Sequence, residues 1–153
     1  RAPSNAIYNA DFKFEFGKAY TLKQSANAAA TIVSSGRGVY EALDAAKKLE
    51  EQGVAINVID MPTIDEAAIV ELYRTGKPVF IAEQNNGYLW SHFRKVLFER
   101  EASINTKNLV AINTTTQGGL HYIHSGTYAE LAAHYGLDAA HLNATILKTL
   151  KKL

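Results

Sequence analysis

Two glycines flank an arginine at Gly36-Arg37-Gly38, directly after an apolar β-branched run and before an Ala-rich helical pattern. A turn of this kind leaves the amides at the start of the helix open to an anion, and an arginine guanidinium such as that of Arg37 is a common ligand of phosphate and carboxylate. Asp60 ends the next apolar run, where dinucleotide-binding folds place the acid that holds a ribose hydroxyl. Glu41, however, occupies the third glycine position of that fingerprint and sets a negative charge where a pyrophosphate would approach. The pattern therefore favours a plain tight turn over nicotinamide binding.

A second polar group follows another apolar run, at residues 83–87 with the sequence Glu-Gln-Asn-Asn-Gly. Glu83 would lie at the carboxyl end of a central strand, where open α/β sheets place functional side chains. It could instead cap the loop that follows or form an ion pair that holds it, and we favour this structural role slightly.

Composition excludes several classes of site. The 153 residues are 47% hydrophobic and 20% charged, with a formal net charge of +1, which gives no electrostatic reason to expect nucleic acid or a membrane surface as a partner. The chain has no cysteine, so disulfides and zinc–thiolate sites are excluded. His121 and His124 have helical metal-ligand spacing, but they follow Gly118-Gly119 and have no carboxylate near in sequence. We therefore expect no metal site.

The ends and the hydropathy of the chain bear on its organisation. No apolar run approaches the ~20 residues of a membrane span, and no signal-peptide pattern is present, so we expect a cytoplasmic protein. The chain begins at Arg1 without a methionine. We expect residues 1–10 to be a linker from a preceding domain, residues 11–153 to form one domain, and the whole to be a piece of something longer.

Strand and helix patterns alternate along the chain. Residues 12–16 alternate apolar and charged side chains, as an extended segment does, and residues 19–22 follow as a short strand. Further strands are predicted at residues 28–34, 54–59, 78–82 and 109–112, and helices at residues 39–52, 65–76, 88–101, 127–134 and 138–150. Strands joined by helical crossovers are mostly parallel, so the sequence predicts a three-layer α/β/α sandwich.

Several of these segments together resemble the C-terminal domain of the transketolase family, whose enzymes use thiamine diphosphate. The resemblance rests on Gly17-Lys-Ala, on residues 30–43 (Ala-Thr-Ile-Val-Ser-Ser-Gly-Arg-Gly-Val-Tyr-Glu-Ala-Leu) and on residues 58–65 (Val-Ile-Asp-Met-Pro-Thr-Ile-Asp). It continues through Val-Phe-Ile-Ala-Glu at residues 79–83, Ser-Gly-Thr-Tyr-Ala-Glu-Leu at 125–131 and Tyr-Gly-Leu-Asp-Ala at 135–139. The ordered set covers nearly the whole chain.

The resemblance implies a five-stranded mixed sheet in the order 1-3-2-4-5, with the first strand antiparallel. It implies a parent enzyme that binds thiamine diphosphate and magnesium in two preceding domains, forms a homodimer, and transfers two-carbon ketol units between sugar phosphates. The reacting groups of that chemistry belong to the preceding domains, so we expect neither a catalytic residue nor a cofactor ligand in this chain.

The chain departs from the family pattern after Glu83, where relatives commonly have a histidine and a Gly-Gly-Leu-Gly type run. Here the segment reads Gln-Asn-Asn-Gly-Tyr-Leu-Trp. Aromatic residues at helical spacing are usually core, but they also serve as interface anchors. We name Tyr88, Trp90 and Phe93 as possible interface residues.

With the strand order that the resemblance implies, the crossovers leave in opposite directions from the strand that ends at Ser34. A ligand crevice would then lie between the loops at residues 35–38 and 83–87. An anion there would sit against the amides of Gly38 and Val39. The candidate crevice residues are Arg37, Gly38, Val39, Glu83, Gln84 and Asn85.

Two other interpretations stay open. One is the corresponding domain of a deoxyxylulose-phosphate synthase or of the β subunit of a 2-oxo acid dehydrogenase, although the latter ends differently from residues 125–131. The other is a free-standing α/β ligand-binding module that uses the turn at Gly36.

Overall fold

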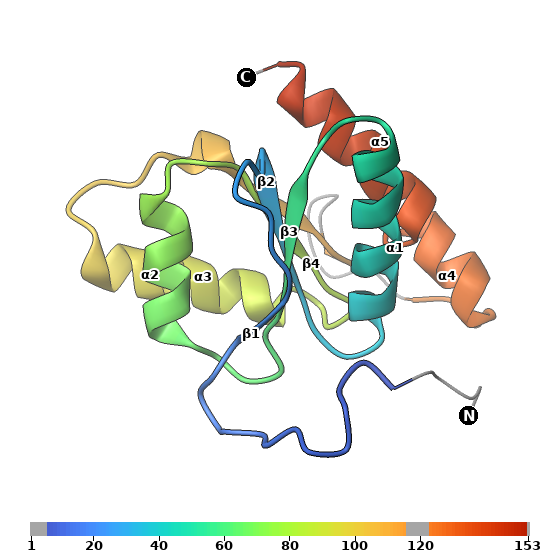
Figure 1. The fold of residues 1–153 in the computed structure, drawn as a ribbon, viewed down its shortest axis with the longest axis horizontal. Helices are drawn as coiled ribbons and strands as arrows, with labels where there is room; N and C mark the ends of the chain where they lie inside the picture. Colours follow the sequence, from blue (N-terminus) through green and yellow to red (C-terminus); the bar gives the residue numbers. More distant parts are fainter. Residues whose placement is uncertain (1–5, 116–122, 153) are drawn as a thin grey trace.

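A five-stranded sheet forms the centre of the computed structural model, which describes residues 6–115 and 123–152 (Figure 1). The sheet order is β1-β3-β2-β4-β5. β1 pairs with β3 antiparallel, whereas the β2–β3, β2–β4 and β4–β5 pairs are parallel. The strands are β1 (Tyr20–Lys23), β2 (Ala30–Ser34), β3 (Ile56–Asp60), β4 (Val79–Ala82) and β5 (Leu109–Ile112). This topology confirms the predicted mixed sheet and its strand order.

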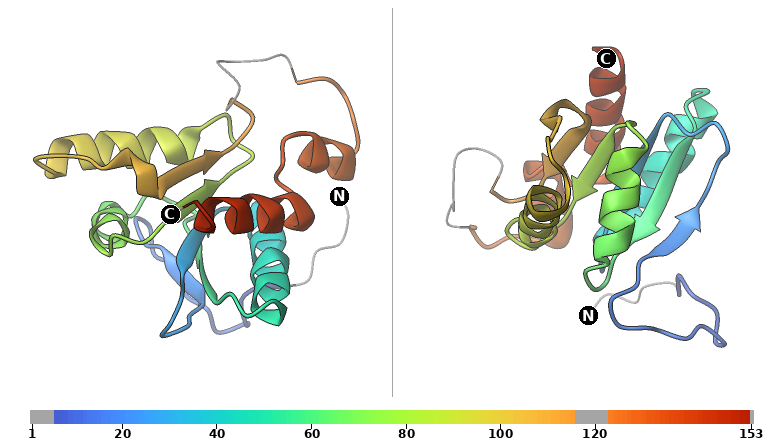
Figure 2. Two further views of the ribbon diagram at one scale, coloured as in Figure 1. Left: turned by 90° about the horizontal axis from the view of Figure 1, so that it is seen from above. Right: turned by 90° about the vertical axis from the view of Figure 1, so that its left-hand side faces the viewer.

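Helices cover both faces of the sheet and complete the three layers (Figures 1 and 2). α1 (Gly38–Glu51), α4 (Tyr128–His134) and α5 (Ala139–Leu150) lie on one side, and α2 (Glu66–Arg74) and α3 (Tyr88–Arg100) lie on the other. A short 3-10 turn, η1 (Thr106–Asn108), leads into β5. None of the described helices is long and apolar enough to span a bilayer.

Two hydrophobic clusters fix these layers, one on each face of the sheet. The alanine-rich face of α1, with Ala42, Ala45 and Ala46 fully buried, packs with α5 against Ile32 and Phe80. On the other face α2 and α3 pack around Phe93. β2 and β4 are buried along their whole length, as expected of central parallel strands with helices on both sides.

The N-terminal segment differs from the prediction. The alternating residues 12–16 form no strand, and β1 begins at Tyr20. Alternation indicates which side of an extended chain is apolar, but a strand needs a neighbour to accept its hydrogen bonds, and residues 12–16 pair with no strand of the sheet. Residues 1–5 of the predicted linker lie outside the described residues, and the domain boundary at residue 11 stays a prediction.

Candidate functional site

The two loops of the predicted crevice leave adjacent strands toward opposite faces of the sheet. β2 and β4 are hydrogen-bonded neighbours. Residues 35–38 lead from β2 into α1 on one face, and residues 83–87 lead from β4 into α3 on the other. The chain therefore has a topological switch point between these strands, which is where open α/β sheets place ligands.

A buried serine joins the two strands at this point. The hydroxyl of Ser34 donates a hydrogen bond to the carbonyl of Ala82 at 2.7 Å. The Cα of Gly38 packs closely against this hydroxyl, since a Cβ at position 38 would stand 2.6 Å from the Ser34 Oγ. The second glycine of the turn is thus required by close packing, which is a structural reason for the pattern at residues 36–38.

Glu83 anchors the start of α3. Its side chain is fully buried, and its two carboxylate oxygens accept hydrogen bonds from the amides of Leu89 at 2.8 Å and Trp90 at 2.9 Å. Burial raises the pKa of Glu83, while the amide hydrogen bonds act in the opposite direction. A carboxylate at a helix N-terminus also complements the helix dipole. The structure therefore gives Glu83 the capping role that we favoured.

Tyr128 contacts residues of both loops of the predicted crevice. The Arg37 guanidinium lies over the Tyr128 ring, 3.6 Å from its centroid. The Gln84 amide donates to the Tyr128 hydroxyl at 2.9 Å, and the hydroxyl reaches Glu41 at 3.3 Å. Burial, and next the negative charge of Glu41, raise the pKa of Tyr128. This tyrosine joins two predicted crevice residues, Arg37 and Gln84, to α4.

Glu41 extends the same contact to α5. Its second carboxylate oxygen accepts a hydrogen bond from the amide of Ala139 at 2.9 Å, in the first turn of α5. Glu41, whose negative charge disfavours dinucleotide binding, therefore connects α1 to both α4 and α5. Sequence reasoning missed this role because the partners of Glu41 are far away along the chain.

The remaining residues of the two predicted crevice loops form hydrogen bonds that hold the loop backbone. The Val39 amide donates to the carbonyl of Gly36 at 3.3 Å, and the Asn85 carbonyl accepts from the amide of Tyr88 at 2.7 Å. Asn86 has a φ of 33°, in the left-handed region, where Asn is tolerated better than most residues, and its side chain accepts from the Thr114 hydroxyl at 2.7 Å.

Asp60 is covered by an aromatic side chain that the sequence analysis did not single out. The Tyr8 hydroxyl donates to the Asp60 carboxylate at 2.6 Å, in the position where a ribose hydroxyl would bind in a dinucleotide fold. Burial raises the pKa of Asp60, and the hydrogen bond from Tyr8 lowers it by a smaller amount. Tyr8 stacks on Phe12, with ring centroids 3.8 Å apart, and both rings contact Tyr20.

The three candidate interface residues have different environments. Phe93 is fully buried in the core between α3 and the sheet, so our interface prediction is wrong for this residue, because no partner can reach it. Trp90 is half-buried against the same cluster, and Tyr88 is 54% exposed. The interface prediction for Tyr88 and Trp90 stays a prediction.

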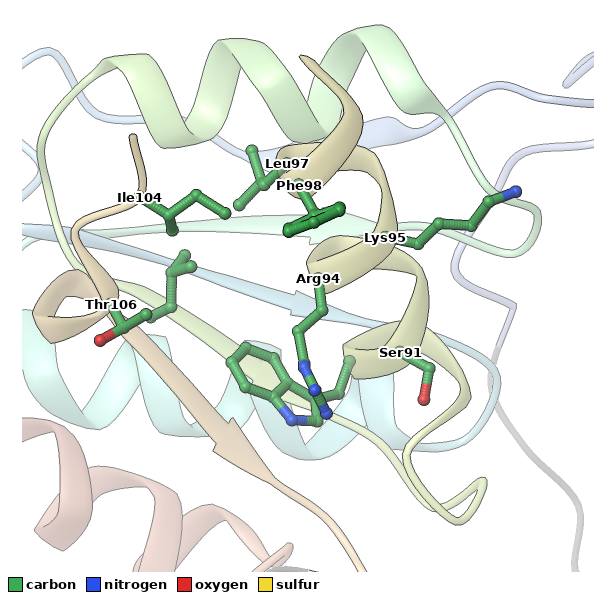
Figure 3. Close-up of a pocket in the computed structure, with 9 residues that line it drawn as sticks. Ser91, Arg94, Lys95, Leu97, Phe98, Ile104 and Thr106 are labelled. Carbon is green, nitrogen blue, oxygen red and sulfur yellow. The ribbon is translucent and has the colours of Figure 1, made fainter. Parts of the chain in front are cut away.

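A surface groove of about 640 Å³ runs along the outer side of α3. Figure 3 shows Arg94 and Phe98 of α3 on one wall, with Ile104 and Thr106 facing them from the segment that leads into β5. Phe98 is 81% exposed. The groove residues come from the length of α3 and from the approach to β5.

No group of three or more His, Cys, Asp or Glu side chains in residues 6–115 and 123–152 is arranged to hold a metal ion. His121 lies outside the described residues. The His124 ring packs edge-on against His134, with centroids 5.2 Å apart.

Comparison with known proteins identifies one family. The family model described as "Transketolase, C-terminal domain" matches residues 17–142. The chain is 29% identical to the mouse protein named "Transketolase-like protein 2" over 99% of its own length and 24% of that protein. It is 31% identical to one of the subunits of the apulose-4-phosphate transketolase of Actinobacillus succinogenes, over 87% of its length and 42% of that protein. The chain thus spans less than half of these relatives.

Solved structures agree with the topology. A chain of "Split gene transketolase, inactive beta4 tetramer" superposes with a TM-score of 0.76 at 30% identity, covering 96% of this chain and 46% of that one. Transketolase from Campylobacter jejuni superposes with a TM-score of 0.64 at 23% identity over 94% of this chain and 20% of that one, a likeness that bears on the fold alone.

Proposed function

Because the chain belongs to the transketolase C-terminal domain family, we propose that it is the C-terminal part of a thiamine-diphosphate-dependent enzyme of transketolase type. That enzyme transfers two-carbon ketol units between sugar phosphates in the cytoplasm. The chain contributes folding and assembly, its partners are the preceding domains and a second subunit, and it binds neither nucleic acid nor membrane.

One observation carries the proposal. The match to the split-gene transketolase chain extends over 96% of this chain at 30% identity, so the family likeness is not confined to the βαβ unit that many folds share. That structure is described as a tetramer of one kind of chain, and a relative 31% identical is named as a transketolase subunit. Both descriptions support a place for this chain in an enzyme of several domains or subunits.

The chemistry of the described residues supports assigning the cofactor to the preceding domains. Bound in those domains, thiamine diphosphate would supply a nucleophilic carbon and an electron sink for two-carbon transfer. The buried carboxylates at the crevice edge do not fit this group: Glu83 accepts two helix amides, and Asp60 accepts the Tyr8 hydroxyl. Their hydrogen bonds hold loops and helices in place.

Activity assays test the proposal directly. We expect the 153-residue chain alone to transfer no ketol unit from a ketose phosphate to an aldose phosphate with thiamine diphosphate and magnesium present. We expect the intact enzyme, with its preceding domains, to do so. Transfer by the isolated chain, abolished by a point substitution within it, would overturn the assignment of a non-catalytic role.

A second candidate function is favoured by one relative. A deoxyxylulose-phosphate synthase of Magnetococcus marinus is 31% identical over 89% of this chain and 21% of that protein. The same intact enzyme should therefore also be given pyruvate and glyceraldehyde 3-phosphate. Release of carbon dioxide with that pair, and no transfer with ketose phosphates, would select the synthase. Tight binding of a sugar phosphate to the isolated chain would instead favour the ligand-binding module.

A further inference from the structure

Two exposed phenylalanines stand on the segment before β1. Phe14 is 54% exposed and Phe16 is 87% exposed, in a chain whose other described phenylalanines except Phe98 are at least partly buried. Large apolar side chains that stay in water at neighbouring positions mark interaction sites more often than isolated ones do.

The segment that carries them is held firmly in place on both sides. On the N-terminal side, Tyr8 is hydrogen-bonded to Asp60 and stacked on Phe12. On the C-terminal side, the Gly17 amide donates to the Thr63 hydroxyl at 2.8 Å. The Ala19 amide donates to the Asp65 carboxylate at 3.0 Å. The exposure of Phe14 and Phe16 is therefore not that of a loose tail.

The sequence between these anchors has the pattern of a strand without a neighbour. Phe12, Phe14 and Phe16 alternate with Lys13 and Glu15, as the side chains of an extended strand do. Within this segment the Glu15 amide donates to a side chain, the Tyr20 hydroxyl, and the edge of the sheet nearby is occupied by β1. The Tyr20 hydroxyl also donates to the Glu15 carbonyl at 3.2 Å. The segment thus presents apolar side chains that no strand of the sheet covers, so its phenylalanines rather than its backbone are open to a partner.

From these features we propose that residues 13–16 are a docking surface for the domain that precedes this chain in the intact enzyme. The inference rests on the proposed function. The preceding domain is the occupant because the segment lies directly between it and β1, and because the relatives extend well beyond the region that this chain matches. Phe16 inserts into an apolar surface of that domain, and the mixed charges of Lys13 and Glu15 form a polar rim.

The docked segment sets the orientation of the two domains. Its anchors attach to the loop that follows β3 and to the N-cap of α2, since Asp65 also accepts from the Ala68 amide. A partner domain that binds Phe16 is therefore fixed relative to the carboxyl edge of the sheet. It is not joined to this domain through a flexible linker alone. This gives the crevice edge a role in domain arrangement that is separate from ligand binding.

Hydrogen exchange on the intact enzyme tests the surface. In the wild type we expect slow exchange of the amides of Lys13, Phe14 and Phe16; the amides of Glu15 and Gly17 already donate within this chain and do not report docking. Phe16→Ser should speed exchange there by about tenfold or more and should separate the single thermal transition into two. Phe98→Ser is the matched control, since Phe98 is 81% exposed on another face, and it should change neither result. Phe16→Leu, which keeps an apolar side chain, should retain the slow exchange.

Fast exchange of the Lys13, Phe14 and Phe16 amides in the wild-type enzyme would overturn the proposal, and so would equal effects of Phe16→Ser and Phe98→Ser. The proposed function is tested separately by ketol transfer in the wild-type enzyme. Slow exchange in an enzyme that transfers no ketol unit would leave the docking surface standing and refute the function. Ketol transfer by an enzyme whose docking segment exchanges fast would support the proposed function and refute the docking surface.

Discussion

The guanidinium of Arg37 stacks on the ring of Tyr128, 3.6 Å from its centroid. Arg37 is the N-cap residue of α1 and Tyr128 is the first residue of α4, so the contact joins two elements far apart in sequence. Cation–π contacts of this kind stabilise by about 0.5–2 kcal/mol, more where water is excluded. The arginine that suggested an anion ligand from its position in the turn thus has a partner within the fold.

Substitutions of Tyr128 should separate its two contacts. Tyr128→Phe keeps the ring over Arg37 but loses the hydroxyl that Gln84 and Glu41 share, and we expect a loss of about 1 kcal/mol of unfolding free energy. Tyr128→Ala removes both contacts and should cost about 2 kcal/mol or more. Urea denaturation measures both values. Tyr88→Phe, at a site 54% exposed, should have no effect, and equal losses in the two Tyr128 variants would show that the ring contributes nothing.

Anion binding at the crevice is a separate prediction. We expect any bound sulfate or sugar phosphate to contact the Gly38 amide near Arg37, since the Val39 amide already donates to the carbonyl of Gly36. Since Tyr128 holds Arg37, Tyr128→Ala should bind sulfate more tightly than the wild type does. Titration followed by amide chemical shifts would report the site, and shifts confined to other parts of the chain would contradict it.

Gly38 should tolerate no side chain while Ser34 keeps its hydroxyl. In Gly38→Ala the new Cβ would stand 2.6 Å from the Ser34 Oγ, so the hydrogen bond to Ala82 must break or the strand must shift. We expect a loss of about 1–3 kcal/mol of unfolding free energy. In a double-mutant cycle, Ser34→Ala should recover part of it. Strictly additive losses would show that the two residues do not interact in this way.

The pH dependence of stability should change in Asp60→Asn. Burial raises the pKa of Asp60 in the folded chain, so the folded state holds a proton that the unfolded state releases. The contribution of Asp60 is therefore most favourable below its unfolded pKa and is lost as pH rises through the folded value. Denaturation of wild type and variant between about pH 4 and pH 7 should show the variant gaining relative stability as pH rises. A constant difference over this range would refute the shift.

Phe93 and Trp90 should respond differently to truncation. Phe93→Ala removes a fully buried side chain, and we expect a loss of about 3–5 kcal/mol of unfolding free energy. Trp90→Ala should weaken self-association while the fold stays cooperative. Sedimentation and thermal melts measure the two effects, and an unchanged dimer with a sharply lowered melting temperature for Trp90→Ala would assign this residue to the core.

The repeated β–α units could be predicted from the sequence because their signals are local. The apolar run of β2, the turn at Gly36 and Gly38, and the alanine stripe of α1 each follow from neighbouring residues, and the structure has all three. The strand order came from the family resemblance, since periodicity alone does not say which strands are neighbours. β2 and β4 pair side by side although α1, β3 and α2 lie between them along the chain.

The crevice was harder to predict because its contacts are distant in sequence. The contacting pairs are far apart along the chain: Glu41 with Ala139, Tyr8 with Asp60, and Arg37 with Tyr128. Nothing local distinguishes Tyr128 from any other helix-start tyrosine. The aromatic spacing of Tyr8, Phe12 and Tyr20 was a usable signal, but it indicates a cluster and does not name Asp60 as the residue beneath it.

The antiparallel pairing of β1 with β3 has a consequence for synthesis on the ribosome. β1 is an edge strand that leaves the ribosome before its neighbour β3 has been made. During that interval Phe14 and Phe16 have neither their anchors at Thr63 and Asp65 nor the rest of the sheet. In the proposed enzyme, a preceding domain that has already folded shields these side chains from aggregation, because domains fold in order as the chain emerges.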